Sequence, residues 1–256
     1  MQRHALVSGG TGGIGRIISA RLAEHGYGVV VLSRSSARAQ LVVDGLAGGP
    51  HFAAEAGVTD SASLARAAEV VRKRYGALDL LVNCHGITTP VPHADLDALS
   101  DDWIDRIFAT NWRGAFACVR AFRGLLMAAN ADGRREMEDG NLSSVIVNIS
   151  SVAGTTGLGS NVAYAASKAA LDSMTRSLAR ALAPHIRVVS VAPGWVLGEY
   201  AARFDAAYIR AQTGATPLKK LATPDDVADA VLAVCTLLND TTGCIIPVDG
   251  GRPLGM

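Results

Sequence analysis

Two residues four positions apart, Tyr164 and Lys168, have side chains that could do chemistry together. They follow an apolar run at 145–149 and fall in a helical pattern that starts near Asn161, where this spacing puts both on one helix face. A fixed ammonium ion beside a phenol favours the phenolate and lowers the phenol pKa from about 10. With Ser151 to hold a carbonyl oxygen and a hydride donor nearby, the pair would form a carbonyl–alcohol redox centre. The same spacing also occurs on ordinary solvent-exposed helices, so the elements that position the pair decide its meaning.

A glycine-rich stretch near the N-terminus is the second candidate site. It lies between a β-prone run at 5–7 and a helical pattern at 14–25, and reads Ser8-Gly9-Gly10-Thr11-Gly12-Gly13-Ile14-Gly15. Glycines at such a junction permit a tight turn and let a phosphate approach the N–H groups that begin a helix. Such a string alone can be only a turn, but its place between strand and helix indicates a dinucleotide-binding loop.

The end of the next strand-like run, 29–32, bears on which dinucleotide is bound. Many dinucleotide folds place an acid here to bind the ribose 2′-hydroxyl. This chain has Ser33 followed by Arg34, which suits a 2′-phosphate because a guanidinium can pair with it. Arg34 could equally be a solvated loop residue. We therefore expect NADP(H) to be preferred and NAD(H) to be possible.

The rest of the chain alternates strand-like and helical patterns. We predict strands at 5–7, 29–32, 51–54, 78–82, 145–149, 186–192 and 245–248. We predict helices at 14–25, 37–46, from a cap at Thr59 or Asp60 to Tyr75, and at 101–110, 115–130, 161–183 and 224–238, the last capped by Thr223. This alternation indicates an α/β fold: one Rossmann-type domain over 1–256, with a doubly wound parallel sheet of about seven strands and helices on both faces.

Three segments interrupt this alternation. Residues 87–100 contain prolines and acidic turns and are expected to form a loop. Residues 131–144 are charged and contain glycine, which is typical of an exposed insertion. Residues 195–216 mix aromatic residues with glycine and alanine, and fit a lid over a substrate or, equally well, an amphipathic surface helix.

Composition narrows the class of partner. The chain has 256 residues, of which 49% are hydrophobic, and a net charge of +1, so a large core is expected and no nucleic-acid or membrane-surface partner is indicated. Its four cysteines show no C-x-x-C spacing and no secretory signal precedes them, so we expect reduced thiols in a cytoplasmic protein. No apolar run reaches the roughly 18 residues of a membrane span. The six scattered histidines indicate no metal site.

Taken in order, these motifs resemble the short-chain dehydrogenase/reductases, and among them the 3-oxoacyl-reductase-like group. The resemblance covers nearly the whole chain. It rests on the glycine loop, on Asn83-Cys84-His85-Gly86 in place of an Asn-Asn-Ala-Gly strand end, on Pro193-Gly194 and Asp249-Gly250-Gly251, and on the set Asn111, Ser151, Tyr164 and Lys168.

The resemblance implies a role for each member of that set. Tyr164 would be the general acid in reduction and the base in oxidation, and Ser151 would bind the substrate oxygen. Lys168 would hold the nicotinamide ribose and lower the Tyr164 pKa, and Asn111 would anchor a water that relays protons to Lys168. The cofactor would lie at the carboxyl ends of the strands, in contact with Gly9, Thr11, Gly13, Ile14, Gly15, Ser33, Arg34, Val58, Asn83, Gly86, Tyr164, Lys168, Pro193, Gly194 and Val196.

Some positions depart from the family pattern. Cys84 and His85 replace an Asn and an Ala, which would change the packing on the adenosine side. The remaining departures are glycines: Gly57 for an Asp that contacts the adenine, Gly198 for a Thr that binds the carboxamide, and Gly12 for a basic residue that helps bind a 2′-phosphate.

The expected activity is therefore hydride transfer between NADP(H) and a small-molecule carbonyl or secondary alcohol. The family's carrier-protein reductases use basic residues near 144 and 185, where this chain has Ser144 and His185. Two alternatives stay open: a non-catalytic dinucleotide-binding sensor or scaffold, and an NAD-dependent alcohol dehydrogenase of the same fold. By family analogy we expect a homotetramer built on the helices near 101–130 and 161–183.

Overall fold

A seven-stranded parallel sheet forms the centre of the computed structural model, which describes residues 2–131, 144–199 and 201–255. The strand order is β3-β2-β1-β4-β5-β6-β7. Because β2 and β4 lie on opposite sides of β1, the chain reverses direction across the sheet there, at the topological switch point. The strands are β1 (His4–Ser8), β2 (Gly28–Ser33), β3 (Phe52–Glu55), β4 (Leu80–Asn83), β5 (Ser144–Ile149), β6 (Ile186–Pro193) and β7 (Ile245–Val248).

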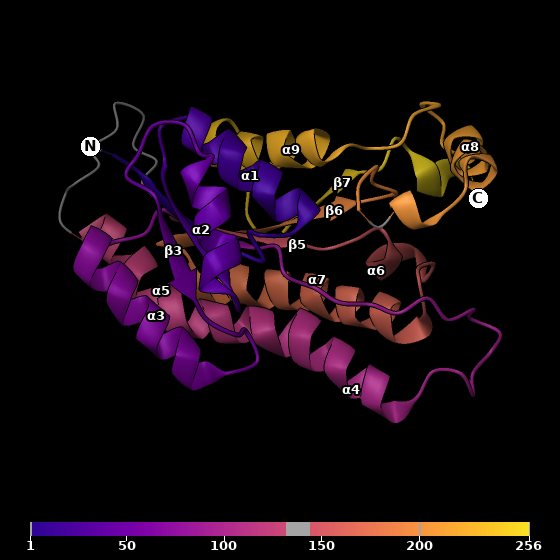
Figure 1. Ribbon diagram of the computed structural model, residues 1–256, viewed down its shortest axis with the longest axis horizontal. Helices are drawn as coiled ribbons and strands as arrows, with labels where there is room; N and C mark the ends of the chain where they lie inside the picture. The colour runs from indigo at the N-terminus through magenta and orange to yellow at the C-terminus, as the bar shows by residue number, and fades with distance from the viewer. Residues whose placement is uncertain (1, 132–143, 200, 256) are drawn as a thin grey trace.

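Helices cover both faces of the sheet (Figure 1), which confirms the predicted doubly wound fold. One face carries α1 (Gly13–Glu24), α2 (Ser36–Asp44) and α9 (Pro224–Thr236); the other carries α3 (Ser61–Tyr75), α4 (Asp101–Phe108), α5 (Ala115–Ala131) and α7 (Val162–Leu182). Shorter elements lie at the carboxyl end of the sheet: α6 (Ala153–Thr156), η2 (Ala201–Arg203), α8 (Ala206–Ala215) and η3 (Arg252–Gly255).

The strands are apolar on both sides, because successive side chains point to opposite faces and both faces are covered. In β1, Leu6 packs into the core under α3 and α5, together with Phe122. Its neighbour Val7 packs into the core under α1 and α9, together with Ile18 and Val231. This arrangement leaves the ends of the strands as the places where polar side chains can gather.

Side-chain caps fix where several helices begin. Asp60, rather than Thr59, caps α3 by accepting from the amides of residues 62 and 63. Thr223 begins α9 as predicted, in a capping box with Asp226. Asn161 caps α7 by accepting from the amide of Tyr164, so the predicted start of this helix is confirmed.

Several predicted boundaries were wrong. Helices expected at 101–110 and 115–130 form one continuous segment, in which the π-helical η1 (Ala109–Gly114) joins α4 to α5. Strand β4 starts at Leu80 rather than Leu78, because the Leu78 amide donates to the Leu125 carbonyl of α5.

Of the insertion expected at 131–144, residues 132–143 lie outside the described residues, while Ser144 is buried at the start of β5.

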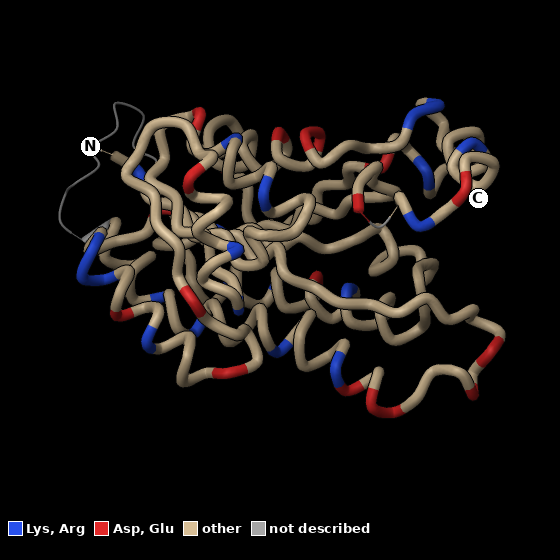
Figure 2. The backbone as a smooth tube through the Cα atoms, viewed as in Figure 1, with Lys and Arg blue, Asp and Glu red and all other residues tan. Residues whose placement is uncertain are grey.

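Charged residues are spread over the outer helices with both signs interspersed (Figure 2). Among the described residues, no helix is both long and apolar enough to span a membrane. In the same part of the chain, no three His, Cys, Asp or Glu side chains are grouped so as to hold a metal ion.

Candidate active site

A cavity of about 870 Å³ opens at the carboxyl ends of the strands. The glycine loop, the ends of β4, β5 and β6, the start of α7 and the segment 195–212 all contribute to its walls. Eleven of the predicted site residues line it: Gly9, Gly13, Ile14, Gly15, Gly86, Ser151, Tyr164, Lys168, Pro193, Gly194 and Val196. The other six lie outside its lining: Thr11, Ser33, Arg34, Val58, Asn83 and Asn111.

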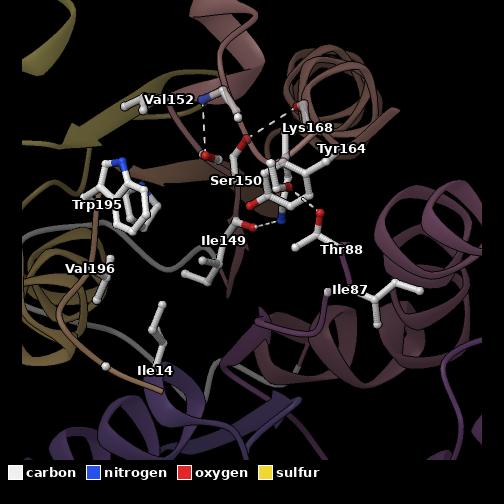
Figure 3. A pocket seen from close by; sticks show the side chains of 18 of the residues that line it. Ile14, Ile87, Thr88, Ile149, Ser150, Val152, Tyr164, Lys168, Trp195 and Val196 are labelled. Carbon is white, nitrogen blue, oxygen red and sulfur yellow. Dashed lines mark hydrogen bonds between the residues drawn. The ribbon is translucent and has the colours of Figure 1, made fainter. Parts of the chain in front are cut away.

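Tyr164 and Lys168 lie one turn apart on α7 and face the same cavity, as Figure 3 shows. The Lys168 Nζ lies 5.7 Å from the centroid of the Tyr164 ring. It also donates a 2.8 Å hydrogen bond to the carbonyl oxygen of Ile149, the last residue of β5. The end of the strand therefore holds the ammonium group near the phenol.

Burial gives Lys168 an unusual acidity. Lys168 is only 4% exposed, and removal from water disfavours the charged amine. Burial lowers the pKa of Lys168 to about 8, although the negative charge of Asp172 acts in the opposite direction. The lysine is therefore mostly protonated at neutral pH but loses its charge within a moderately alkaline range.

Asn161 connects the start of α7 to the loop that follows Gly86. Its carboxamide nitrogen donates to the Thr89 carbonyl at 2.7 Å and to the Thr88 hydroxyl at 3.3 Å. Its oxygen accepts from the Tyr164 amide at 2.7 Å. One buried side chain thus fixes both the helix that carries Tyr164 and the loop that faces it.

Asn111 lies in the π-helical turn beside Gly86. Its Oδ1 accepts from the Ile87 amide at 2.8 Å, and its Nδ2 donates to the Ile87 carbonyl and the Ser167 hydroxyl. A Cβ atom on Gly86 would lie 3.4 Å from Asn111 Oδ1 and 3.7 Å from Lys168 Nζ. Asn111 and Lys168 therefore border the same glycine, and a π-turn often marks such functional positions.

Ser151 follows β5 and is half-buried at the cavity wall. Its hydroxyl oxygen accepts from the Ala153 amide at 3.1 Å, which leaves the hydroxyl hydrogen able to donate into the cavity. The preceding Ser150 instead directs its hydroxyl to the Lys168 carbonyl.

The glycine loop has the form of an anion cradle. Gly9 has a φ of +69°, and a Cβ there would lie 2.8 Å from the His85 main chain; a Cβ on Gly15 would lie 2.3 Å from the Gly9 carbonyl oxygen. By contrast, a Cβ on Gly12 or Gly13 would meet only ordinary van der Waals contacts, and no side chain caps the N-terminus of α1. The free N–H groups at this end of the helix fit the diphosphate of a dinucleotide.

A carboxylate lies beside this cradle. The Glu199 Cδ is 3.7 Å from where a Cβ on Gly13 would lie, and Glu199 is exposed. Its negative charge opposes an anion at the helix end, but an exposed side chain can turn away. The sequence analysis did not find Glu199, because only the fold brings it next to Gly13.

The proposed ribose end lies where β1, β2 and β3 finish. The Thr11 and Ser33 hydroxyls are 3.3 Å apart. Arg34 is exposed, with its Cγ 3.8 Å from where a Cβ on Gly57 would lie. Val58 packs against Gly114 instead: a Cβ on Gly114 would lie 2.9 Å from the Val58 Cγ2 atom.

Asn83 and His85 lie on the side of the site that faces the core. The Asn83 side chain is buried and donates to the Asn148 Oδ1 at 2.9 Å. His85 Nδ1 lies 2.7 Å from the Ser8 hydroxyl. Burial, and next the charge of Lys168, lower the pKa of His85 to about 3, so this ring is neutral.

Comparison with known proteins agrees with this geometry. A family model described as enoyl-(acyl carrier protein) reductase matches residues 9–252. Carbonyl reductase family member 4 from Danio rerio is 35% identical over 261 residues, which cover 100% of both chains.

Solved structures of similar sequence share the fold of this chain. A structure from Burkholderia xenovorans assigned to the short-chain dehydrogenases/reductases is 32% identical, with a TM-score of 0.88 over 99% of this chain and 98% of that one. A 3-ketoacyl-(acyl-carrier-protein) reductase from Brucella melitensis, complexed with NADH, is 29% identical, with a TM-score of 0.84 and 98% of each chain covered.

The fold and site thus define an NAD(P)-dependent oxidoreductase. The chain belongs to the short-chain dehydrogenase/reductase family, in its 3-oxoacyl-reductase-like group.

Proposed function

We propose that the protein reduces a ketone to a secondary alcohol with NADPH, and catalyses the reverse oxidation with NADP⁺. One observation carries this proposal: the Tyr164 phenol and the buried Lys168 ammonium group lie one helical turn apart on the wall of the same cavity. A proton donor and a fixed positive charge are what a carbonyl oxygen needs as it becomes an alkoxide.

Each residue of the site has a distinct part in this reaction. The Tyr164 hydroxyl donates its proton to the substrate oxygen, and the Ser151 hydroxyl donates a hydrogen bond to the same atom. Lys168 stabilises the phenolate that remains, and Asn111 orders the turn behind it. In the balanced reaction the C=O π bond breaks, a hydride adds to carbon and a proton adds to oxygen. The cofactor supplies the hydride when bound and is itself oxidised.

The cofactor would be held by three groups of residues. Gly9, Gly13, Ile14 and Gly15 would hold the diphosphate, and Thr11, Ser33, Arg34 and Val58 the adenosine end. Asn83, Gly86, Tyr164, Lys168, Pro193, Gly194 and Val196 would hold the nicotinamide half. The preference for NADPH rests on Arg34, whose exposed guanidinium stands at the end of β2 without an acid beside it at position 33.

We also propose that the enzyme works in the cytoplasm and assembles as a homotetramer. The exposed rings of Trp112 and Phe116, stacked 6.1 Å apart on η1 and α5, support a subunit contact there.

The test is an assay of NADPH and NADH oxidation with a set of ketones, with the alcohol identified by NMR. An enoyl thioester in the same assay examines the reaction named in the description of the family model. Alcohol formation from a ketone supports the proposal. Reduction of the enoyl thioester alone, or binding of cofactor without any turnover, contradicts it and favours a different reductase or a non-catalytic sensor.

A further inference from the structure

Three aromatic side chains form one wall of the cavity: Trp195, Phe204 and Tyr208. The Phe204 and Tyr208 rings stack with centroids 4.7 Å apart and 17° between their planes. The Trp195 indole meets both edge-on, at 5.3 and 5.6 Å. We call these three residues the aromatic wall. Figure 3 shows the Trp195 ring across the cavity from Tyr164.

The aromatic wall is held in place at two ends. Trp195 directly follows β6 and Gly194, so the sheet fixes its main chain. Tyr208 and Gln212 are four apart on α8 and both line the cavity. The Arg252 guanidinium donates to the main-chain oxygen and the side-chain oxygen of Gln212, which ties this face of α8 to the C-terminal turn.

Apolar side chains from other elements also line the cavity, among them Pro90, Val91 and Leu158. The Val91 amide donates to the Ser160 carbonyl at 2.8 Å, so the loop is fixed against the start of α7. A flat substrate packed on the aromatic wall would therefore also meet apolar side chains elsewhere in the cavity.

The described lining residues with a formal charge, the histidines left aside, are Lys168, Glu199 and Arg252. Lys168 lies beside Tyr164, Glu199 lies beside the glycine loop, and Arg252 donates to Gln212 on α8. Gln212 is neutral, so Arg252 keeps its positive charge beside α8. The three rings of the aromatic wall are therefore the basis for the substrate class.

From these contacts we propose that the substrate is a ketone that carries an aromatic ring, with the ring packed on the aromatic wall. This proposal rests on the proposed ketone reduction and names its substrate class. The rings of the wall prefer an aromatic partner because offset-stacked and edge-on pairs attract beyond the effect of apolar area alone. A saturated ring of the same size fills the space but lacks this attraction.

The test uses a matched pair of ketones, acetophenone and cyclohexyl methyl ketone, which share a carbon skeleton. The quantity compared is the ratio of their kcat/KM values in wild type and in variants, because this cancels their difference in intrinsic reactivity. Phe204→Leu and Tyr208→Leu remove one ring each from the wall. Each should lower the acetophenone-to-cyclohexyl ratio about 3- to 10-fold.

Tyr75→Leu is the control. It removes a ring that packs against His4 and Phe52 and does not line the cavity, so the ratio between the two ketones should stay as in wild type. A ratio that stays constant in both wall variants overturns the proposal, as does a fall in the control as large as in the wall variants.

A binding measurement tests the proposed substrate class independently of the proposed ketone reduction. Calorimetry with NADPH present, a cofactor form that cannot oxidise an alcohol, gives the affinities of 1-phenylethanol and 1-cyclohexylethanol for each protein. Tighter binding of the phenyl alcohol, lost in Phe204→Leu, supports the aromatic assignment even if neither ketone is reduced. Equal binding of the two alcohols overturns it even if both ketones are reduced, and ketone reduction itself then stands alone.

Discussion

The ammonium nitrogen of Lys168 lies 2.8 Å from the carbonyl oxygen of Ile149, so the last residue of β5 positions the charge that faces Tyr164. Strand and helix come from consecutive parts of the chain, and this contact joins them at the reacting end of the cavity. The position of the charge is therefore set by the sheet and not only by the helix that carries it.

Removal of the phenol hydroxyl should abolish most of the activity. Tyr164→Phe keeps the ring and its contacts, so the fold and the affinity for NADPH should stay nearly unchanged. Turnover should fall about 100-fold or more, because a positioned general acid contributes on that scale. Circular dichroism and NADPH titration serve as controls. Turnover like that of wild type in the folded variant would remove Tyr164 from the mechanism.

Cofactor binding should depend on pH through Lys168. Its pKa of about 8 means that the ammonium form is present below this pH and is lost as the pH rises through it. We expect the dissociation constant of NADPH to increase by about tenfold between pH 7 and pH 9.5, the value of one charge-assisted hydrogen bond. Lys168→Met should bind more weakly at pH 7 and show no such increase. A flat profile in wild type would contradict the assigned charge.

Asp172 should make stability depend on pH in the opposite sense from an ordinary surface carboxyl. It is 2% exposed, four residues after Lys168, and neither of its oxygens has a hydrogen-bond partner among the described residues. Burial raises its pKa, despite the nearby Ser150 and Ser190 hydroxyls. The contribution of the neutral acid to the free energy of unfolding is therefore present at low pH. It is lost as the pH rises through the pKa of Asp172 in the folded protein.

Asp172→Asn removes this titration. The melting temperature of the variant minus that of wild type should therefore increase from pH 4 to pH 8, because only wild type must bury a charge at the higher pH. Differential scanning calorimetry across this range gives the comparison. A difference that is constant or decreases with pH would show that Asp172 ionises without cost.

Removal of the charge on Glu199 should strengthen cofactor binding. Glu199→Gln takes a negative charge away from the Gly13 end of α1, where the diphosphate is proposed to bind, and should lower the NADPH dissociation constant about 2- to 5-fold. The gain should shrink at high salt. Asp240→Asn, which removes an exposed charge outside the cavity lining, is the control. An equal gain in both variants would point to net charge and not to this position.

Cofactor choice should follow the end of β2. Arg34 should contribute about 10- to 150-fold to the affinity for a 2′-phosphate. A carboxylate at position 33 would repel that phosphate and accept the ribose hydroxyl instead. We expect wild type to prefer NADPH, and Ser33→Asp combined with Arg34→Ala to prefer NADH. The measurement is kcat/KM for both cofactors with one ketone; a wild type that prefers NADH would show that Arg34 is only a solvated loop residue.

Sequence reasoning predicted those features that depend on local pattern. The alternation of apolar runs with helical periodicity gave all seven strands and the doubly wound sheet, and the helix cap at Thr223 could be read from its neighbours. The spacing of Tyr164 and Lys168 predicted that they share a helix face. These features depend on residues close together in the chain.

Features that depend on contacts between distant segments could not be predicted. The π-turn at Asn111 arises where its side chain bonds to Ile87, and the bonds of Asn161 to Thr89 cross more than 70 positions. The approach of Glu199 to Gly13 likewise exists only in the folded chain. No periodicity or spacing in the sequence marks such contacts.

Helix α8 has a consequence for the redesign of this enzyme. Within its ten described residues none is fully buried, although Tyr208 and Gln212 face the cavity. Residues 206–215 can therefore be randomised at little cost to the free energy of folding, while the sheet and α7 keep Tyr164 and Lys168 in place. New substrate ranges should be reachable by directed evolution of this one segment, with the residues proposed to transfer the proton left unchanged.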